Sequence, residues 1–174
     1  DIFNKAGVDY ACLGNEETCT GDSARRIGNE YLFQTMAEQN REIFEQYEFK
    51  KIVTQCPHCF TTLKNDYAEL GIELDVVHHS QFIDELIQTE KIKPNNWVEE
   101  DITFHDPCYL GRANSIYEQP RDVIKSLGVE ILEMKRRAGE FGEMDESTFI
   151  REWLTRTGLF NKESISTSAL ENLP

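Results

Sequence analysis

The sequence has no long hydrophobic run and few basic residues. No stretch approaches the roughly 18 consecutive apolar residues of a membrane-spanning helix, and residues 1–20 show no basic segment followed by an apolar one. Lys and Arg total 18 against 32 Asp and Glu, which gives a formal net charge of -14. Such a chain repels nucleic-acid backbones and anionic lipid surfaces. We therefore expect no transmembrane segment, no export signal and no nucleic-acid partner.

Motifs of nucleotide-dependent and hydrolytic enzymes are also missing. The sequence contains no glycine-rich phosphate loop of the G-x-G-x-x-G or G-x-x-x-x-G-K-[ST] type, no G-x-S-x-G elbow and no H-E-x-x-H motif. With 39% hydrophobic and 29% charged residues, the composition is that of a folded chain. The 174 residues have room for one domain or for two small α/β lobes.

Short apolar runs alternate with helical patterns along most of the chain. We expect strands at 8–13, 52–53, 74–77, 102–105 and 129–134. We expect helices from Asp22 or Ser23, either of which can act as cap, to about Phe44, and at 57–70, 80–87, 120–127 and 148–159, with an irregular tail at 164–174. This alternation predicts the α/β class, with parallel-sheet βαβ units and helices on both faces.

Two details of this prediction bear on function. Ligands of parallel sheets collect at the carboxyl ends of strands, and Cys56 and Cys108 both follow a strand-like run. The first long helix is expected to bury an apolar stripe and to expose residues 38–42. The inward residues of that stripe are expected to be Ile27, Tyr31, Met36, Ile43 and Phe44.

The five cysteines are an odd number, and two of them form Cys56-Pro57-His58-Cys59. This pattern favours a reducing compartment, for which the cytoplasm is the expected location, over a disulfide framework. A C-x-x-C turn lets two sulfurs converge on a metal, and a helix starting at Pro57 would aim N–H groups at the thiolates. The same motif also serves zinc ribbons and thioredoxin-like dithiols, so those alternatives stay open. His58 is placed to hydrogen-bond a sulfur.

Cys19 lies in a loop, NEETCTGDSARR, that follows the first expected strand. Gly21 permits close approach of the backbone, and Arg25 and Arg26 are placed to offset nearby negative charge. Cys19 is thus either a third thiolate ligand beside the C-x-x-C pair or a small buried cysteine at a helix start.

The remaining cysteines and histidines give weaker signals. Cys108 ends a strand in a rigid turn, where it is either functional or packed against Tyr109. Cys12 lies within an apolar run, where we expect a small buried hydrophobe and no ligand. His78 and His79 precede a helix, so capping or packing is the expected role, with metal ligation as the alternative.

Four strings in a fixed order are more specific than the C-x-x-C pair alone. They are LGNEETCTGDSARRIGNEYLFQ, IVTQCPHCFTTLKNDY, VVHHSQFIDELI and ITFHDPCYLGRANSIYEQPRDVIKSLGVEILEM. Over about residues 1–135 they closely resemble the cysteine-rich (CCG) domain proteins, iron–sulfur oxidoreductases related to heterodisulfide reductase. The resemblance implies two repeats, each with a lone cysteine, a Cys-Cys-Gly or variant and a C-x-x-C, that bind [4Fe–4S] clusters and exchange electrons with redox partners.

On this resemblance Cys19 belongs to the middle motif of the first repeat, and Cys56 and Cys59 are its closing pair. Cys108 is then the opening cysteine of the second repeat. The opening cysteine of the first repeat would lie upstream of Asp1, and no cysteine follows residue 135. We therefore expect two related lobes with the second incomplete. The expected parts are 1–93 as the first repeat, 94–135 as the start of the second, and 136–174 as a divergent polar segment.

The leading hypothesis is an iron–sulfur electron-transfer protein, or a subunit of an oxidoreductase, with Cys19, Cys56 and Cys59 as metal ligands. Its cofactor would be a [4Fe–4S] cluster, its partner a flavoprotein or another iron–sulfur subunit, and Cys108 would belong to a degenerate, empty second site, because one sulfur cannot hold a cluster. The alternatives are a structural zinc-binding or metal-free interaction module, and a dithiol–disulfide exchanger using the C-x-x-C pair.

Overall fold

The computed structural model describes residues 1–95, 98 and 100–133, all of which lie in one compact unit, Asp1–Ala138. The helix expected at 148–159, the tail at 164–174 and Met134 at the end of the last expected strand fall outside the described residues. Among those that are described, no helix combines the length and the apolar character needed to cross a membrane.

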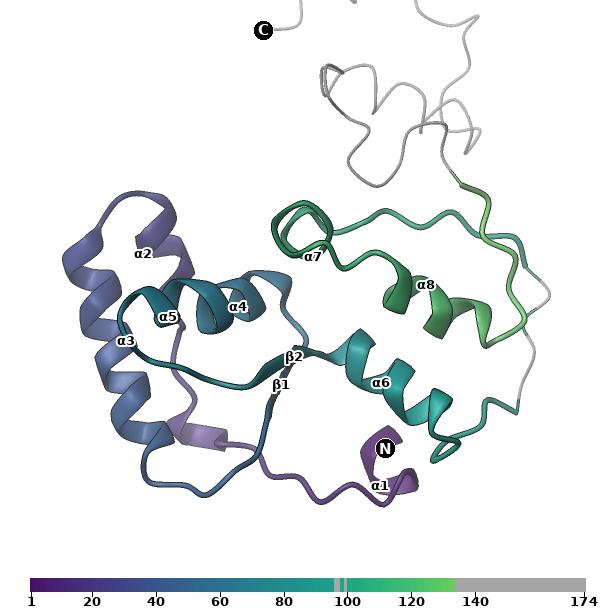
Figure 1. The fold of residues 1–174 in the computed structure, drawn as a ribbon, viewed down its shortest axis with the longest axis horizontal. Helices are drawn as coiled ribbons and strands as arrows, with labels where there is room; N and C mark the ends of the chain where they lie inside the picture. The colour runs from purple at the N-terminus through teal and green to yellow at the C-terminus, as the bar shows by residue number, and fades with distance from the viewer. Residues whose placement is uncertain (96–97, 99, 134–174) are drawn as a thin grey trace, which may run out of the picture. The chain divides into compact units, whose positions relative to one another are not determined.

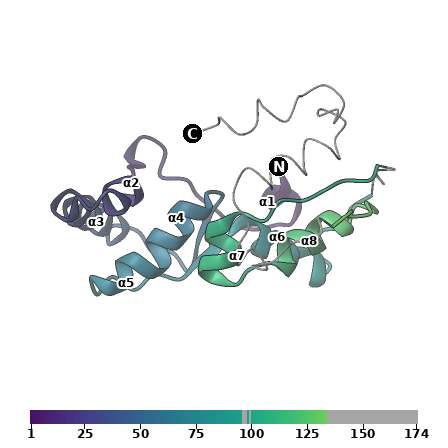
Figure 2. The ribbon, with the colours of Figure 1, turned by 90° about the horizontal axis from the view of Figure 1, so that it is seen from above.

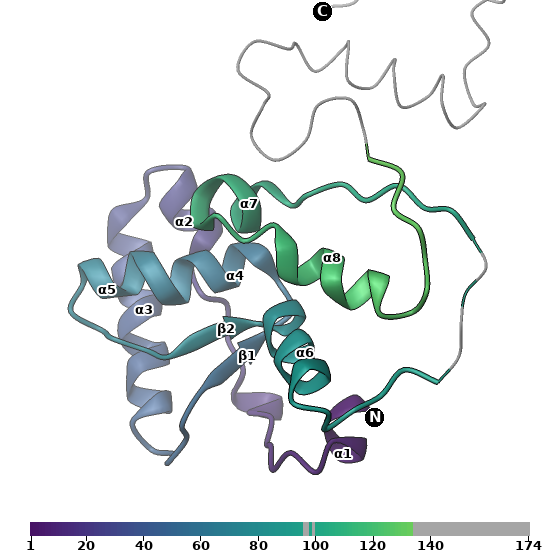
Figure 3. The ribbon, with the colours of Figure 1, turned by 45° about the vertical axis from the view of Figure 1, so that its right-hand side comes forward.

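A small parallel sheet lies at the centre of this unit (Figures 1 and 3). Strand β1 (Ile52–Thr54) pairs with β2 (Val76–His78) in parallel, with Val53 opposite Val77. One continuous helical segment joins the strands: α4 (Pro57–Thr61), the π-helical turn η2 (Thr62–Asp66) and α5 (Tyr67–Glu69). The predicted strands, the intervening helix and their βαβ connection are confirmed.

Gly71 ends this helical segment, as predicted. Its φ of +79° is a conformation that glycine adopts without a Cβ penalty. The N–H groups of Gly71 and Ile72 bond to the carbonyls of Ala68 and Tyr67 at 3.0 Å each, the pattern of a Schellman cap. The chain then turns back toward β2.

The predicted long helix is instead two helices, α2 (Asp22–Arg26) and α3 (Glu30–Phe44). Gly28, at φ +80°, breaks the helix, and the Asn29 side chain caps the second one by accepting the Leu32 N–H at 3.2 Å. The break changes the helical phase, so Ile27 and Tyr31 are 79% and 84% exposed and their predicted burial is wrong. The N-cap of α2 is Gly21, so the predicted capping by Asp22 or Ser23 is also wrong.

The inner face of α3 is formed by Phe33, Ala37 and Asn40. Asn40 was predicted to face solvent but is only 3% exposed. The core that α3 covers is made of apolar side chains from the helical segment between the strands and from later elements. It includes Phe60, Leu63, Tyr67, Ile72, Val76, Leu110 and Ile116.

The other helices are short. They are α1 (Ile2–Lys5), the 3-10 turn η1 (Gly14–Glu16), α6 (His79–Gln88), α7 (Cys108–Asn114) and α8 (Glu118–Lys125). The predictions of α6 and α8 are confirmed, whereas α7 replaces the turn expected around Cys108. The strand predicted at 8–13 is wrong, because no described strand pairs with this segment. The predicted burial of Cys12 is wrong too, since the residue is exposed.

The last two predicted strands shrink to one parallel bridge between Ile102 and Ile131. Its backbone bonds run from Ile102 N–H to the Glu130 carbonyl at 3.1 Å and from Leu132 N–H to the Ile102 carbonyl at 2.7 Å. Thr103 and Leu132 are exposed, so this pair offers little apolar surface to bury. An isolated two-stranded pair is marginal in water, which explains why the ladder stays short.

The later helices pack against the earlier ones (Figures 1 and 2). Helix α7 lies beside α4, and α8 lies beside α6. Asn114 at the end of α7 donates to the Thr61 hydroxyl at 2.8 Å, and the Thr61 hydroxyl in turn donates to the Tyr109 carbonyl at 3.3 Å. These bonds fix α7, and with it Cys108, against the helix that begins at the C-x-x-C pair.

Candidate metal centre

The Cys56–Cys59 pair lies at the junction between β1 and α4. Cys56 is the N-cap residue of α4, Pro57 occupies the first helical position, and Cys56 Sγ accepts the Cys59 N–H at 3.5 Å. The predicted arrangement, in which the start of the helix directs an N–H group at a sulfur, is confirmed. Such a donor stabilises a thiolate at this position.

Cys19 lies on the loop before α2, where its Sγ accepts the Gly21 N–H at 3.4 Å. Gly21 has φ +86°, and a Cβ built on it would lie 3.0 Å from Phe33 Cδ2. The site therefore requires glycine both for its backbone conformation and for space, as the sequence predicted.

Two buried polar side chains hold this loop in place. The Asn40 amide donates to the Cys19 carbonyl at 3.0 Å, and the Tyr67 hydroxyl donates to the Thr20 carbonyl at 3.0 Å. Asn40 also donates to the Tyr67 oxygen at 3.2 Å and accepts from the Thr18 hydroxyl at 2.9 Å. The loop that carries Cys19 is thus anchored to α3 and α5, by residues that the sequence reasoning had not linked to it.

The structure brings Cys19, Cys56 and Cys59 into electrostatic reach of one another. Burial raises the pKa of the Cys59 thiol to about 11; the Thr20 hydroxyl opposes this rise, and Cys56 and Cys19 add to it. Burial likewise raises the pKa of Tyr67 to about 12, and Cys19 and Cys59 raise it further. The Thr20 oxygen is buried and makes no hydrogen bond of ordinary geometry within the described residues. The site therefore gathers three sulfurs and a polar group with spare bonding capacity.

The donor set fits an iron–sulfur cluster. It consists of soft thiol ligands, two backbone N–H groups already directed at sulfurs, and the Thr20 hydroxyl beside Cys59. Within the described part of the chain, no group of three or more His, Cys, Asp or Glu side chains converges closely enough to hold a single metal ion. The two observations agree, because cluster cysteines bind different iron atoms and do not share one metal.

The two arginines expected to offset the sulfurs are engaged elsewhere. Arg25 pairs with Glu30 and Glu69, both at 2.5 Å, and Arg26 pairs with Asp22 at 3.1 Å and with Asp66. The predicted compensation of thiolate charge by these arginines is therefore wrong. They neutralise carboxylates instead.

His58 connects the ligand turn to α2 and α7. Its Nδ1 pairs with Asp22 Oδ2 at 3.0 Å rather than with a sulfur, and its ring stacks on Tyr109 with centroids 3.9 Å apart. Burial acts to raise the pKa of Asp22, but hydrogen bonds from His58, Arg26 and Thr62 outweigh it and leave the pKa lowered.

Cys108 begins α7, next to the Tyr109 that stacks on His58, and it is exposed. It is not among the groups that shift the pKa of Cys59. The structure therefore brings the helix that carries Cys108 to the ligand turn without adding its sulfur to the group of three.

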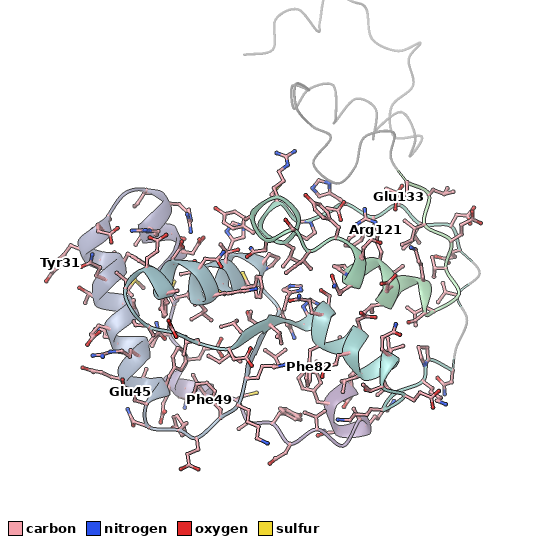
Figure 4. The ribbon with its side chains drawn as sticks, viewed as in Figure 1. Tyr31, Glu45, Phe49, Phe82, Arg121 and Glu133 are labelled. Atoms are coloured by element: carbon pink, nitrogen blue, oxygen red, sulfur yellow. The ribbon has the colours of Figure 1, made fainter. Side chains whose placement is uncertain are left out.

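Arg121 holds the loop before Cys108 and was not recognised from the sequence. Its side chain is 1% exposed and pairs with Asp106 at 2.7 Å and with Glu133 at 3.0 Å, while it donates to the Tyr117 carbonyl at 3.0 Å (Figure 4). The hydrogen bond to Asp106 is the main reason why the pKa of Arg121 is raised. Such a buried charge is recognisable only when its carboxylate partners, far apart in sequence, are seen together.

A groove of about 1120 Å³ lies beside β1 and is mainly apolar. Phe49 and Phe82, labelled in Figure 4, line it from different parts of the chain, together with Val53 and the exposed Cys12. None of the four cysteines predicted as cofactor ligands lines this groove. The candidate centre is therefore separate from the groove.

Comparison with known proteins supports the sequence resemblance. A family model described as a cysteine-rich domain (CCG) matches residues 1–64 and 102–141. An EtfAB:quinone oxidoreductase of Syntrophomonas wolfei is 47% identical over 141 residues, 81% of this chain and 20% of that protein. A probable iron-sulfur-binding oxidoreductase of Bacillus subtilis is 47% identical over 136 residues, 78% of this chain and 19% of that protein.

A third relative is one component of the dihydromethanophenazine:CoB--CoM heterodisulfide reductase of Methanosarcina barkeri. It is 37% identical over 142 residues, 78% of this chain and 35% of that component. The predicted relationship to heterodisulfide reductases is confirmed. The chain thus spans between about a fifth and a third of the length of these relatives. No solved structure matches it.

Proposed function

Because the chain belongs to the cysteine-rich (CCG) domain family, we propose that it is the iron–sulfur-binding, electron-transferring part of an oxidoreductase. The relatives support this function, since they include an EtfAB:quinone oxidoreductase, an iron-sulfur-binding oxidoreductase and a component of a heterodisulfide reductase. The observation that carries the proposal is the gathering of Cys19, Cys56 and Cys59, with backbone N–H groups on two of the sulfurs.

In this proposal Cys19, Cys56 and Cys59 hold the cluster, and the family resemblance points to the [4Fe–4S] type. The cluster would supply reversible one-electron transfer. The protein residues fix the sulfurs: the Gly21 and Cys59 N–H groups stabilise them as thiolates, and the anchored loop before α2 keeps Cys19 near the pair. Cys108 belongs to a second, degenerate site that holds no cluster of its own.

The larger organisation is part of the same proposal. We assign residues 1–93 to the first cysteine-rich repeat, 94–135 to the start of the second and 136–174 to a divergent segment. The two lobes would be related βαβ units with helices on both faces. The redox partner would be a flavoprotein or another iron–sulfur subunit, in the cytoplasm. The complete protein would then be an oxidoreductase.

Anaerobic reconstitution of the 174-residue chain with iron and sulfide tests the ligand assignment. Iron counting and EPR spectroscopy of the reduced protein are expected to show a cluster. Serine at Cys19, Cys56 or Cys59 is expected to lower the iron content at least severalfold, because serine lacks the soft sulfur donor. Cys12→Ser is the matched control and is expected to retain full iron content, because Cys12 lies in the separate groove. Absence of a cluster with all thiols reduced would refute the proposal, and bound zinc would identify a structural site instead.

A further inference from the structure

His78 makes contacts with two elements at once. Its Nε2 lies 2.9 Å from the Gln55 carbonyl oxygen, and its Nδ1 lies 2.8 Å from the Ser80 hydroxyl and 3.4 Å from the Ser80 N–H. A carbonyl oxygen can only accept, so Nε2 must carry the proton and Nδ1 must be the acceptor. The side chain is 3% exposed, and burial lowers its pKa, which favours this neutral form.

The Nδ1 side of the ring caps helix α6. His78 accepts from Ser80 and its own N–H donates to Gln81 Oε1 at 3.2 Å, which together form a capping box. This is the capping role that the sequence predicted for one of the two histidines. The Nε2 side has no part in the cap, so its bond to Gln55 requires a separate explanation.

The Gln55 carbonyl belongs to the peptide group that leads into Cys56. The other end of that peptide group, the Cys56 N–H, donates to the Thr54 hydroxyl at 3.3 Å. Both ends of one rigid plane are therefore held, the carbonyl by His78 and the N–H by Thr54. Fixing this plane sets the direction in which the chain enters Cys56, and therefore where its sulfur points at the start of α4.

We propose that His78 is a positioning residue for the Cys56–Cys59 ligand pair, acting through its Nε2–H bond to the Gln55 carbonyl. That the pair binds a cluster rests on the proposed function, but the positioning itself is a property of the metal-free protein. His78 thereby joins the end of β2 and the cap of α6 to the turn that carries both sulfurs. The linkage means that the C-x-x-C turn is supported from the neighbouring strand and not only by its own helix.

His79 offers a matched control. It is the next residue, its ring lies against that of His78 with centroids 4.2 Å apart, and burial also lowers its pKa. Its Nδ1 is buried and has no partner within the described residues. It therefore shares the surroundings and chemistry of His78, whereas the bond to the Gln55 carbonyl belongs to His78.

Two substitutions at position 78 separate capping from positioning. His78→Asn keeps an acceptor close to the place of Nδ1, where asparagine is a good cap, but is too short to reach Gln55. His78→Gln keeps an amide donor that reaches about as far as Nε2. Helix α6 should be retained in the first variant, as checked by far-UV circular dichroism, while the ligand turn should be retained only in the second.

Hydrogen exchange of the metal-free chain is the primary measurement. The amides of Cys59 and Phe60 report on the turn, because they bond to Cys56 Sγ at 3.5 Å and to the Cys56 carbonyl at 2.9 Å. In His78→Asn they are expected to exchange about tenfold faster, the effect of losing one supporting hydrogen bond. In His78→Gln and in His79→Asn they are expected to stay within about threefold of the parent. Exchange of amides in α8 should not change in any variant.

The same variants are then reconstituted with iron and sulfide. His78→Asn is expected to lose iron to a chelator about tenfold faster than the parent, whereas His79→Asn is not. Unchanged exchange at Cys59 and Phe60 in His78→Asn would overturn the inference. If the parent binds no iron but His78→Asn still speeds exchange, the proposed function fails while the positioning role stands. If His78→Asn does not fold, Thr54→Val removes the other anchor, and unchanged exchange there would also overturn the inference.

Discussion

The burial of Asn40 gives a prediction that sets local helix propensity against loop anchoring. Asn40→Ala removes the donor to the Cys19 carbonyl and the acceptor of the Thr18 hydroxyl, and it leaves the Tyr67 oxygen with one bond fewer. Gln39→Ala changes the adjacent residue, which is exposed. Both substitutions introduce the best helix former into the same helix.

The two variants are expected to change stability in opposite directions. Each hydrogen bond lost at Asn40 costs about 1 kcal/mol, so three cost about 3 kcal/mol. Alanine recovers about 0.6 kcal/mol of helix propensity, which leaves Asn40→Ala destabilised by about 2.4 kcal/mol. Gln39→Ala loses no buried bond and should be neutral or slightly stabilising, within about 0.5 kcal/mol. For a chain of this size the first variant should melt about 5–10 °C lower.

Urea unfolding of the metal-free chain, followed by circular dichroism, measures this difference. A second readout is the rate at which Cys19 reacts with iodoacetamide, which should change in Asn40→Ala and not in Gln39→Ala, since only Asn40 holds the loop. Stabilities of the two variants that agree within about 0.5 kcal/mol, with equal Cys19 reactivity, would show that the Asn40 anchor is energetically unimportant and refute the reasoning.

Three further predictions concern other supports of the site. Arg121→Met leaves the buried Asp106 carboxylate unpaired and should lower the free energy of unfolding by about 3 kcal/mol in urea titrations; a loss below about 1 kcal/mol would contradict the ion-pair account. Gly21→Ala meets the Phe33 ring as well as an unfavourable φ and should lose about 1 kcal/mol more than Gly7→Ala, which has a similar φ of +65° and open space; equal losses would argue against crowding. Because burial lowers the pKa of both His78 and His79, the unfolded chain binds protons that the native chain excludes; the free energy of unfolding should fall as the pH drops below about 6.5, and less steeply in His79→Gln.

The part of the fold that the sequence predicted well is the part governed by local signals. Pro57 follows a short β-branched run and precedes a helical pattern that Gly71 closes, and β1, the helical segment and β2 appear accordingly. The helix start at Pro57 also places an N–H group on Cys56 Sγ, as expected from the motif alone. These features depend on residues within about one helical turn of each other.

The features that the sequence did not predict depend on long-range contacts or on the helix phase. A single Gly28-Asn29 break rotates the face of α3, so Tyr31 points outward and Asn40 inward. A buried asparagine in a run of polar residues is indistinguishable from a solvated one until its partners, Cys19 and Tyr67, are folded against it. Propensity and periodicity contain no information about such partners.

Charge compensation at the centre shows the same limit and has a chemical consequence. The sequence places Arg25 and Arg26 close to Cys19, but the folded chain commits them to carboxylates, and the donors that face the sulfurs are neutral N–H and hydroxyl groups. Neutral donors support a thiolate less than a cation does, and Cys59 accordingly keeps its proton, with a pKa of about 11, when no metal is bound. Ligation by Cys59 must therefore release that proton, and positive charge on the bound metal has to replace the arginines that the fold places elsewhere.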